Sequence, residues 1–293
     1  MSVDARDTGL PAGHGREGAV GRGKVPSGEP PLPGERFRAI FISDLHLGTT
    51  GCKAQALLEF LRAHESDALY LVGDIVDGWQ LRRRWTWRAD HNAVIQEVLR
   101  KSRDGCRVVF IPGNHDEAAR QFDGLSFGGI RVENESEHVL LDGRRLWVVH
   151  GDLFDGVIQH ARWVAYLGDQ LYTTMLWVNH HFNRIRHRFG FSYWSLSQYL
   201  KHRVKDVVGF ITDYERAMAH ETRRRGYDGV VCGHIHKAEI RMIDGVLYCN
   251  DGDWVESLTA LVETYSGRLM ILEWRPAGRP EADDLPARVL ETA

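Results

Sequence analysis

Short apolar runs rich in β-branched and aromatic residues recur along the chain, and segments with helical spacing separate the first three. We expect strands in FRAIFISD, ALYLVGD and CRVVFIPGNHD, at residues 37–44, 68–74 and 106–116. Apolar residues three or four apart predict helices at residues 52–65 and 91–105. Later runs enclose the pairs Asp142–Gly143 and Asp244–Gly245, which are typical of β-hairpins. This order predicts an α/β (α+β) fold, in which two mixed β-sheets pack as a sandwich flanked by helices.

A different pattern fills residues 155–225, where apolar positions follow helical stripes on more than one face. The second helix of this stretch is expected to begin near Ser195, which can act as an N-cap, and to stop at Gly226. We interpret the stretch as a helical insert, or lid, within one domain at residues 37–275. Residues 1–36 predict a disordered leader because they are rich in Gly, Pro and charge, and residues 276–293 predict a flexible tail.

The composition narrows the class of protein. A net charge of −3 and 43% hydrophobic residues are ordinary for a globular protein, and nothing marks the whole chain as a nucleic-acid binder. The N-terminal segment lacks the apolar stretch of a secretory signal, and no apolar run could span a bilayer, so we expect a cytoplasmic protein. The four cysteines form no CxxC pair and lie in or beside apolar runs, which favours buried, reduced thiols over a disulfide.

Polar side chains with metal-binding chemistry follow five of the predicted strands. The segments are SDLHLG with Asp44 and His46, VGDIVDGW with Asp74 and Asp77, PGNHDE with Asn114, His115 and Asp116, VHGD with His150 and Asp152, and GHIH with His234 and His236. Ligands of open α/β sheets gather at the carboxyl ends of strands, so these residues are expected to converge. If GHIH stays extended, both of its histidines face one side and Ile235 points into the core. Each segment alone is also typical of an ordinary loop.

Seven of these side chains are suitable metal donors, which is more than one ion needs. They are Asp44, Asp74, Asn114, His46, His150, His234 and His236. The set suits two divalent ions that share one carboxylate, and Asp74 is the candidate bridge because a carboxylate has two oxygens to share. Mixed Asn, Asp and His ligation fits Mn, Fe, Zn or Co, and of these we expect Mn²⁺.

The ordered set DLH, GDIVD, GNHD, HGD and GHIH resembles the signatures of the calcineurin-like metallophosphoesterases over residues 38–273. The resemblance implies two β-sheets packed together between helices and a binuclear metal centre. It also implies one ion at Asp44, His46, Asp74 and His236, and a second ion at Asp74, Asn114, His150 and His234. Water activated by the two ions would attack phosphorus in line, so the reaction would need no Ser, Cys or His nucleophile.

The residue after Asn114 has an expected role of its own. We expect His115 to protonate the leaving group or to stabilise the phosphate, with Asp116 or Asp44 orienting its ring, and we name His115 and Asp116 as catalytic residues. The alternative is that His115 is only a hydrogen-bonding spacer. Asp77 and Asp152 are interpreted as residues that support ligands or turns, rather than as ligands.

Two stretches outside these segments bear on the substrate. The first, WQLRRRWTW, interleaves aromatic and basic residues, so Trp79 and Arg82 could stack on a base and bind phosphate. The alternative is a solvated basic helix end with core tryptophans. The second is the insert, whose broad apolar surface and basic rim suit an amphiphilic anionic substrate or an anionic membrane surface, unless it simply packs on the sandwich. Nucleic acid is the rival partner, and the near-neutral charge argues against it.

The stretches DGWQLRRRW, GNHDE, GDWVES and YWSLS resemble bacterial proteins related to UDP-2,3-diacylglucosamine pyrophosphatase. This resemblance implies cleavage of the diphosphate of UDP-2,3-diacylglucosamine to lipid X and UMP in lipid A biosynthesis, at the inner face of the cytoplasmic membrane. It implies that Ser195, Lys201 and Lys205 of a lid meet the substrate phosphates. The best-known branch has Arg where this chain has His115, so another nucleotide or lipid phosphoester is the alternative substrate. A scaffold without activity is disfavoured because every metal donor is intact. The sequence predicts no oligomeric state.

Overall fold

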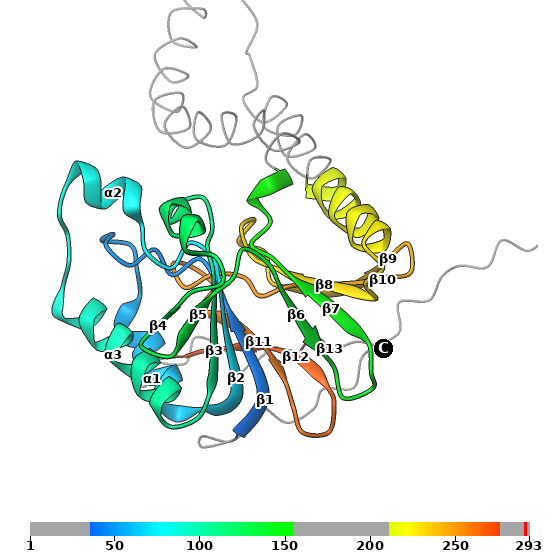
Figure 1. Ribbon diagram of the computed structural model, residues 1–293, viewed down its shortest axis with the longest axis horizontal. Coiled ribbons are helices and arrows are strands. Elements are labelled where there is room, and N and C mark those ends of the chain that lie inside the picture. The colour runs from blue at the N-terminus through cyan, green and yellow to red at the C-terminus, as the bar shows by residue number, and fades with distance from the viewer. Residues whose placement is uncertain (1–35, 155–210, 276–289, 292–293) are drawn as a thin grey trace, which may run out of the picture.

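The computed structural model describes residues 36–154, 211–275 and 290–291. Two mixed β-sheets face one another, and helices cover their outer faces (Figure 1). The predicted fold class is therefore confirmed. Most of the predicted helical insert lies outside the described residues. Among the described residues, none of the helices is both long enough and apolar enough to cross a membrane.

The first sheet has the strand order β13-β12-β11-β1-β2-β3-β5-β4. Its strands are β1 (Arg36–Ile42), β2 (Glu65–Val72), β3 (Arg107–Ile111), β4 (Ser126–Phe127), β5 (Ile130–Val132), β11 (Thr259–Glu263), β12 (Leu269–Glu273) and β13 (Leu290–Glu291). Strands β1, β2, β3 and β5 run parallel, whereas β11 pairs antiparallel with β1. The short strand β13 lies inside the segment expected to be a flexible tail and pairs with β12. The tail prediction did not include this strand.

The second sheet has the order β6-β7-β8-β10-β9. Its strands are β6 (Ser136–Val139), β7 (Arg145–Val148), β8 (Gly229–Cys232), β9 (Glu239–Ile243) and β10 (Val246–Asn250). Both hairpins predicted from Asp-Gly pairs are present, between β6 and β7 and between β9 and β10. In the second, Asp244 and Gly245 both have positive φ, 49° and 82°, as a tight turn between twisted strands requires.

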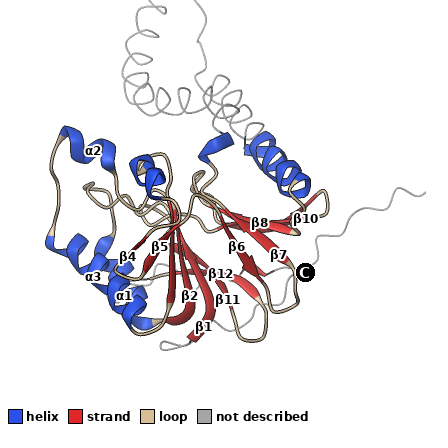
Figure 2. Ribbon diagram, viewed as in Figure 1, coloured by secondary structure: helices blue, strands red, loops and turns tan. Residues whose placement is uncertain are grey.

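Helices pack on the outer face of each sheet (Figure 2). On the first sheet these are α1 (Ala54–Ala63) and α3 (Ala89–Arg103), while α2 (Gly78–Arg83) buries no residue. Residues 211–224 form a helix that contacts the second sheet through Tyr214 and Met218, and the chain turns at Gly226 as predicted. Two short 3-10 helices, Glu117–Phe122 and Asp152–Phe154, follow β3 and β7.

The core lies in three layers. Phe41, Tyr70 and Val148 are among the residues that fill the space between the sheets, and the strands that contribute them are apolar on both faces. The second layer joins the first sheet to α1 and α3, and the third joins Trp147 to the helix at residues 211–224. All four cysteines are free and buried, as expected. This packing fixes the strands and leaves the loops after them to build the site.

Candidate metal centre

The loops that follow β1, β2, β3, β7 and β8 meet and hydrogen-bond to one another. The amide of Asp44 donates to the Gly73 carbonyl at 3.0 Å, and the amide of His46 donates to the Asp74 carbonyl at 2.9 Å. The amide of Gly233 donates to the His150 carbonyl at 3.2 Å. The amide of His234 donates to Asp44 Oδ2 at 2.8 Å and so joins positions 190 residues apart, as convergence at strand ends requires.

Six of the seven predicted donors fall into two compact groups that could each hold a cation. One comprises Asp44, His46 and His236, and the other comprises Asp74, His150 and His234. Within each group the ligand atoms lie within 4.8 Å of one another. Asp74 connects the groups, because its Oδ1 lies 3.5 Å from His150 Nε2 and its Oδ2 lies 3.9 Å from His46 Nε2. This position suits a bridging carboxylate.

The donors project from strained backbone. Asp44, His46, Asp74, His234 and His236 have φ between 48° and 71°, the left-handed region that few side chains adopt. Such strain persists where surrounding structure determines it, and it clusters at functional sites. The expectation of an extended GHIH is wrong, because β8 ends at Cys232 and both histidines have left-handed backbone, and the two side chains join different donor groups. Ile235 nevertheless packs against the core, as expected.

The donor set fits a cation, because several buried polar atoms face the centre without a hydrogen bond among the described residues. These atoms are Asp44 Oδ1, Asp74 Oδ2 and His150 Nε2, and the side-chain oxygen of Asn114 is likewise buried without a hydrogen bond to a described residue. Leaving such groups without partners costs free energy that a cation would recover. His150 Nδ1 lies 2.8 Å from the Val72 carbonyl, which can only accept a hydrogen bond. Nδ1 therefore carries the proton, and Nε2 is the atom that can bind a metal.

The carboxylates and imidazoles of the centre shift one another's pKa values. Burial opposes ionisation of Asp74, but a hydrogen bond and attraction from His150 outweigh it and lower the pKa of Asp74 to about 2. Burial likewise opposes the charged form of the imidazoles, but nearby carboxylates raise the pKa of His46 and of His150 to about 10. Protonated imidazoles thus supply the positive charge beside the carboxylates that bound divalent ions could supply instead.

His115 lies at the edge of this centre and pairs with Asp77. His115 Nδ1 is 3.0 Å from Asp77 Oδ2, and His115 Nε2 is 3.8 Å from Asp74 Oδ2. The expectation that Asp116 or Asp44 orients this ring is wrong, since Asp77 occupies that position. The indole of Trp79 covers the other side of the ring, with centroids 4.3 Å apart and planes inclined by 34°. His46, Asp77 and His115 also form a third group within ligand distance.

Asp116 accepts hydrogen bonds from backbone amides, and Asp152 forms a salt bridge. Asp116 accepts from the amides of Ile75 at 2.7 Å and Gly113 at 2.6 Å, so its carboxylate ties the β2 and β3 loops together. Asp152 pairs with Arg120 at 2.6 Å, which agrees with its interpretation as a supporting residue. Asp77 has a supporting contact too, because it caps α2 by accepting from the Gln80 amide at 2.8 Å.

The predicted substrate residues are placed only in part. Trp79 is beside the centre and 43% exposed, and Trp85 is 73% exposed, so the alternative of core tryptophans is wrong for both. Arg82 lies on the exposed helix α2. Ser195, Lys201 and Lys205 lie outside the described residues. Ser43 and Asp251 are buried behind Asp44. The turn NDGDW follows a strand and was expected near the site without an assigned role, whereas no pattern in the sequence singled out Ser43.

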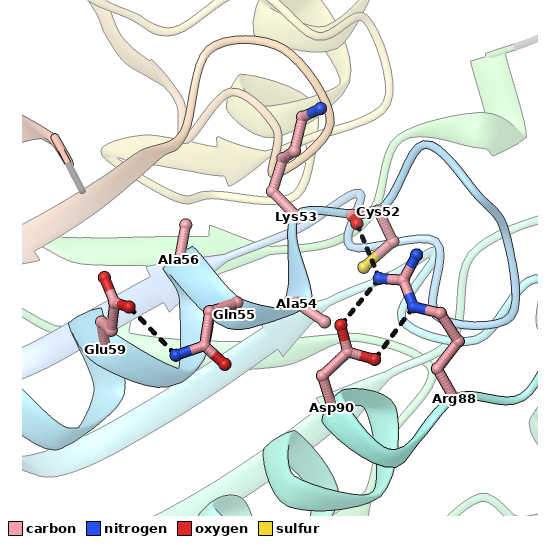
Figure 3. Close-up of a pocket in the computed structure, with 8 residues that line it drawn as sticks. All are labelled: Cys52, Lys53, Ala54, Gln55, Ala56, Glu59, Arg88 and Asp90. Atoms are coloured by element: carbon pink, nitrogen blue, oxygen red, sulfur yellow. Dashed lines mark hydrogen bonds and ion pairs between the residues drawn. The ribbon is translucent and has the colours of Figure 1, made fainter. Parts of the chain in front are cut away.

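A separate surface pocket opens at the start of α1 and is drawn in Figure 3. Its polar groups bind one another: the Arg88 guanidinium pairs with Asp90 at 2.8 Å and donates to the Cys52 carbonyl at 3.3 Å. Gln55 likewise donates to Glu59 at 3.0 Å. We assign this pocket no part in the centre described above.

Two facing sheets whose strand ends gather carboxylates, an amide and histidines define a metal-dependent phosphoester hydrolase. Residues 37–238 match the family model of the calcineurin-like phosphoesterases, and the chain belongs to that family. The chain is 30% identical over 235 residues to a UDP-2,3-diacylglucosamine hydrolase of Stenotrophomonas maltophilia (strain K279a), covering 76% of this chain and 93% of the relative. A protein of the same name from Xanthomonas campestris pv. campestris (strain B100) is 28% identical over 238 residues, with the same shares covered.

Solved structures are similar at lower identity. Zinc-complexed Vps29 of Entamoeba histolytica has a TM-score of 0.43 and 13% identity, covering 86% of this chain and 98% of that chain. An archaeal phosphodiesterase has a TM-score of 0.35 and 12% identity, covering 87% and 99%.

Proposed function

We propose that the enzyme is a two-metal hydrolase that cleaves the diphosphate of UDP-2,3-diacylglucosamine to lipid X and UMP. The single observation that carries the two-metal part is the pair of donor groups joined through Asp74. The substrate part is supported by relatives named UDP-2,3-diacylglucosamine hydrolase that match along 93% of their length. One ion would be held by Asp44, His46, Asp74 and His236, and the other by Asp74, Asn114, His150 and His234.

The bound ions would supply Lewis-acid charge to the phosphate oxygens and lower the pKa of water at the site. The chain's own residues do the rest. Asp77 Oδ2 lies 3.0 Å from His115 Nδ1, on the side of the ring away from Nε2, and so favours an orientation with Nε2 toward the centre. His115 can then donate a proton from Nε2 to the oxygen that leaves phosphorus. Trp79 shields one face of this imidazole from water. Mn²⁺ is the proposed ion, and the same mix of oxygen and imidazole donors also fits Fe, Zn or Co.

The substrate proposal is tested by comparing UDP-2,3-diacylglucosamine with its deacylated analogue in the presence of Mn²⁺. Chromatography would measure UMP release, and bis(p-nitrophenyl) phosphate would report on general phosphodiesterase activity. We expect the acylated substrate to react faster, and we expect Asp74→Asn to lose activity on all three. Asp244→Asn, in an exposed turn, is the matched control and should keep it. Equal rates on the two UDP-sugars would remove the lipid argument, whereas no hydrolysis of any of the three would contradict the hydrolase itself.

We also propose that the protein associates peripherally with an anionic membrane surface, through the exposed segment at α2. No hydrogen bond or ion pair joins the side chains of Arg82, Arg83 and Arg84 to any described residue, and in the sequence they lie between Trp79 and Trp85, whose side chains are exposed. Arginine attracts anionic head groups, and tryptophan favours the interface of a bilayer. Sedimentation with vesicles that contain phosphatidylglycerol should retain the protein at low salt and release it at high salt. Equal retention by neutral phosphatidylcholine vesicles would contradict this proposal.

A further inference from the structure

A buried turn lies behind the proposed metal centre, and none of its residues belongs to the five strand-end segments. It begins at Asn250, the last residue of β10, and continues with Asp251, and both residues are 0% exposed. Strand β10 runs parallel to β8, with Asn250 beside Cys232. The turn therefore leaves its strand next to the loop that carries His234, and the amide of Asp251 donates to the Cys232 carbonyl at 3.0 Å.

Asp251 reaches the donor Asp44 through a single hydroxyl. Asp251 Oδ1 lies 2.6 Å from Ser43 Oγ, and Ser43 Oγ lies 2.7 Å from Asp44 Oδ2. A hydroxyl has one proton and two lone pairs, so Ser43 can accept from one carboxyl group while it donates to the other. Burial raises the pKa of Asp251 well above its usual range, and a neutral carboxyl group can supply the donor that this arrangement needs.

These contacts distinguish the two oxygens of Asp44. Oδ2 contacts Ser43 Oγ and accepts from the amide of His234 at 2.8 Å. Oδ1 has no hydrogen bond among the described residues and faces His236 Nε2 at 3.1 Å and His46 Nε2 at 3.7 Å. The hydrogen bonds thus fix the position of Oδ2, and they direct Oδ1 toward the histidines of the same donor group.

The same turn holds the second ligand loop. Asn250 Nδ2 donates to the Gly233 carbonyl at 2.7 Å, directly before His234. Gly233 approaches so closely that a β-carbon there would lie 2.1 Å from Ser43 Oγ and 2.7 Å from Asp44 Oδ2. The turn and the two ligand loops are therefore packed without space between them, and the position of one loop fixes the other.

We propose that Asp251 and Ser43 are positioning residues that hold Asp44 for the cation it binds, and that Asn250 holds the loop of His234 and His236. This inference rests on the proposed function, because it requires a cation at Asp44. Packing alone does not account for an acid at this position. Asp251 Oδ2 is buried and has no hydrogen bond among the described residues, which lowers stability relative to an apolar side chain.

The test is Mn²⁺ binding by the full chain after its metals are removed with EDTA, measured by equilibrium dialysis and electron paramagnetic resonance. Loss of a residue that orients a metal ligand typically weakens metal binding by about 10- to 100-fold. We expect a loss of this size for one of the two ions in Ser43→Ala and in Asp251→Leu, so the spectrum of a coupled ion pair should change to that of a single ion. Asp251→Asn keeps a donor toward Ser43 and should retain both ions.

Glu263→Gln is the matched control, because Glu263 is equally buried but pairs with His138, away from the ligand loops. It should lower thermal stability without changing Mn²⁺ affinity. If Ser43 and Asp251 act together through one series of hydrogen bonds, the double variant should lose no more Mn²⁺ affinity than either single variant. Two ions bound with unchanged affinity in both single variants would overturn the inference. So would an equal loss at both sites that follows the fall in stability. A wild-type chain that binds no Mn²⁺ would instead refute the proposed function.

Discussion

Gly113 offers a direct test of how tightly the donors are packed. A β-carbon at this position would lie 2.3 Å from Asp74 Oδ1 and 2.7 Å from His150 Cδ2, whereas ordinary contacts begin at 3.4 Å. Gly113→Ala therefore requires Asp74 and His150 to move by about 1 Å. Overpacking of this kind costs about 1–3 kcal/mol, which corresponds to a fall in Tm of about 2–12 °C in a domain of this size.

The same shift should reduce activity, because it moves the proposed bridging carboxylate. A misplacement of about 1 Å can lower the rate of an enzyme by about 100-fold. We would measure kcat/KM on bis(p-nitrophenyl) phosphate together with thermal unfolding. Gly51→Ala is the control, since its β-carbon would meet only ordinary contacts, the nearest being Val255 Cγ1 at 3.5 Å. The reasoning is refuted if Gly113→Ala keeps both the Tm and the turnover of the wild-type enzyme.

Four further predictions concern the site and the core. Asp77→Asn should lower kcat by up to about 100-fold, because the carboxylate lies 3.0 Å from Nδ1 of His115 and 3.3 Å from Nδ1 of the proposed donor His46; an unchanged kcat would contradict this orienting role. Metal binding at pH 7 should release protons, because the pKa of His46 and of His150 is raised to about 10, and calorimetry in two buffers would detect this. These folded-state pKa values exceed the unfolded value of about 6.5. The two protonated histidines therefore contribute their full stabilisation to the metal-free protein below about pH 6.5, and this contribution declines as the pH rises toward 10. A free energy of unfolding in urea that stays constant from about pH 7 to 10 would contradict this prediction. Leu247→Ala, in the layer between the sheets, should cost about 2–5 kcal/mol in urea unfolding, and a loss below about 1 kcal/mol would show that the layer repacks.

The sequence by itself determined much of the fold and the identity of the donors. Strand and helix periodicity were sufficient to predict the two sheets, and Asp244–Gly245 was sufficient to predict its hairpin. Polar residues that directly follow apolar strands were expected to converge, and the structure brings Asp74 and His150 within 3.5 Å of one another. These features are local patterns, so a linear sequence contains them.

The tertiary structure alone decided how the donors are held. The left-handed backbone of His234 and His236 replaced the extended conformation that alternation predicts, because local pattern does not show where β8 ends. The partner of His115 proved to be Asp77, not its neighbour Asp116. The contact from Asp251 to Ser43 joins positions 208 residues apart. Contacts of this kind depend on strand order and on close packing between loops, and no periodicity along the chain specifies either of them.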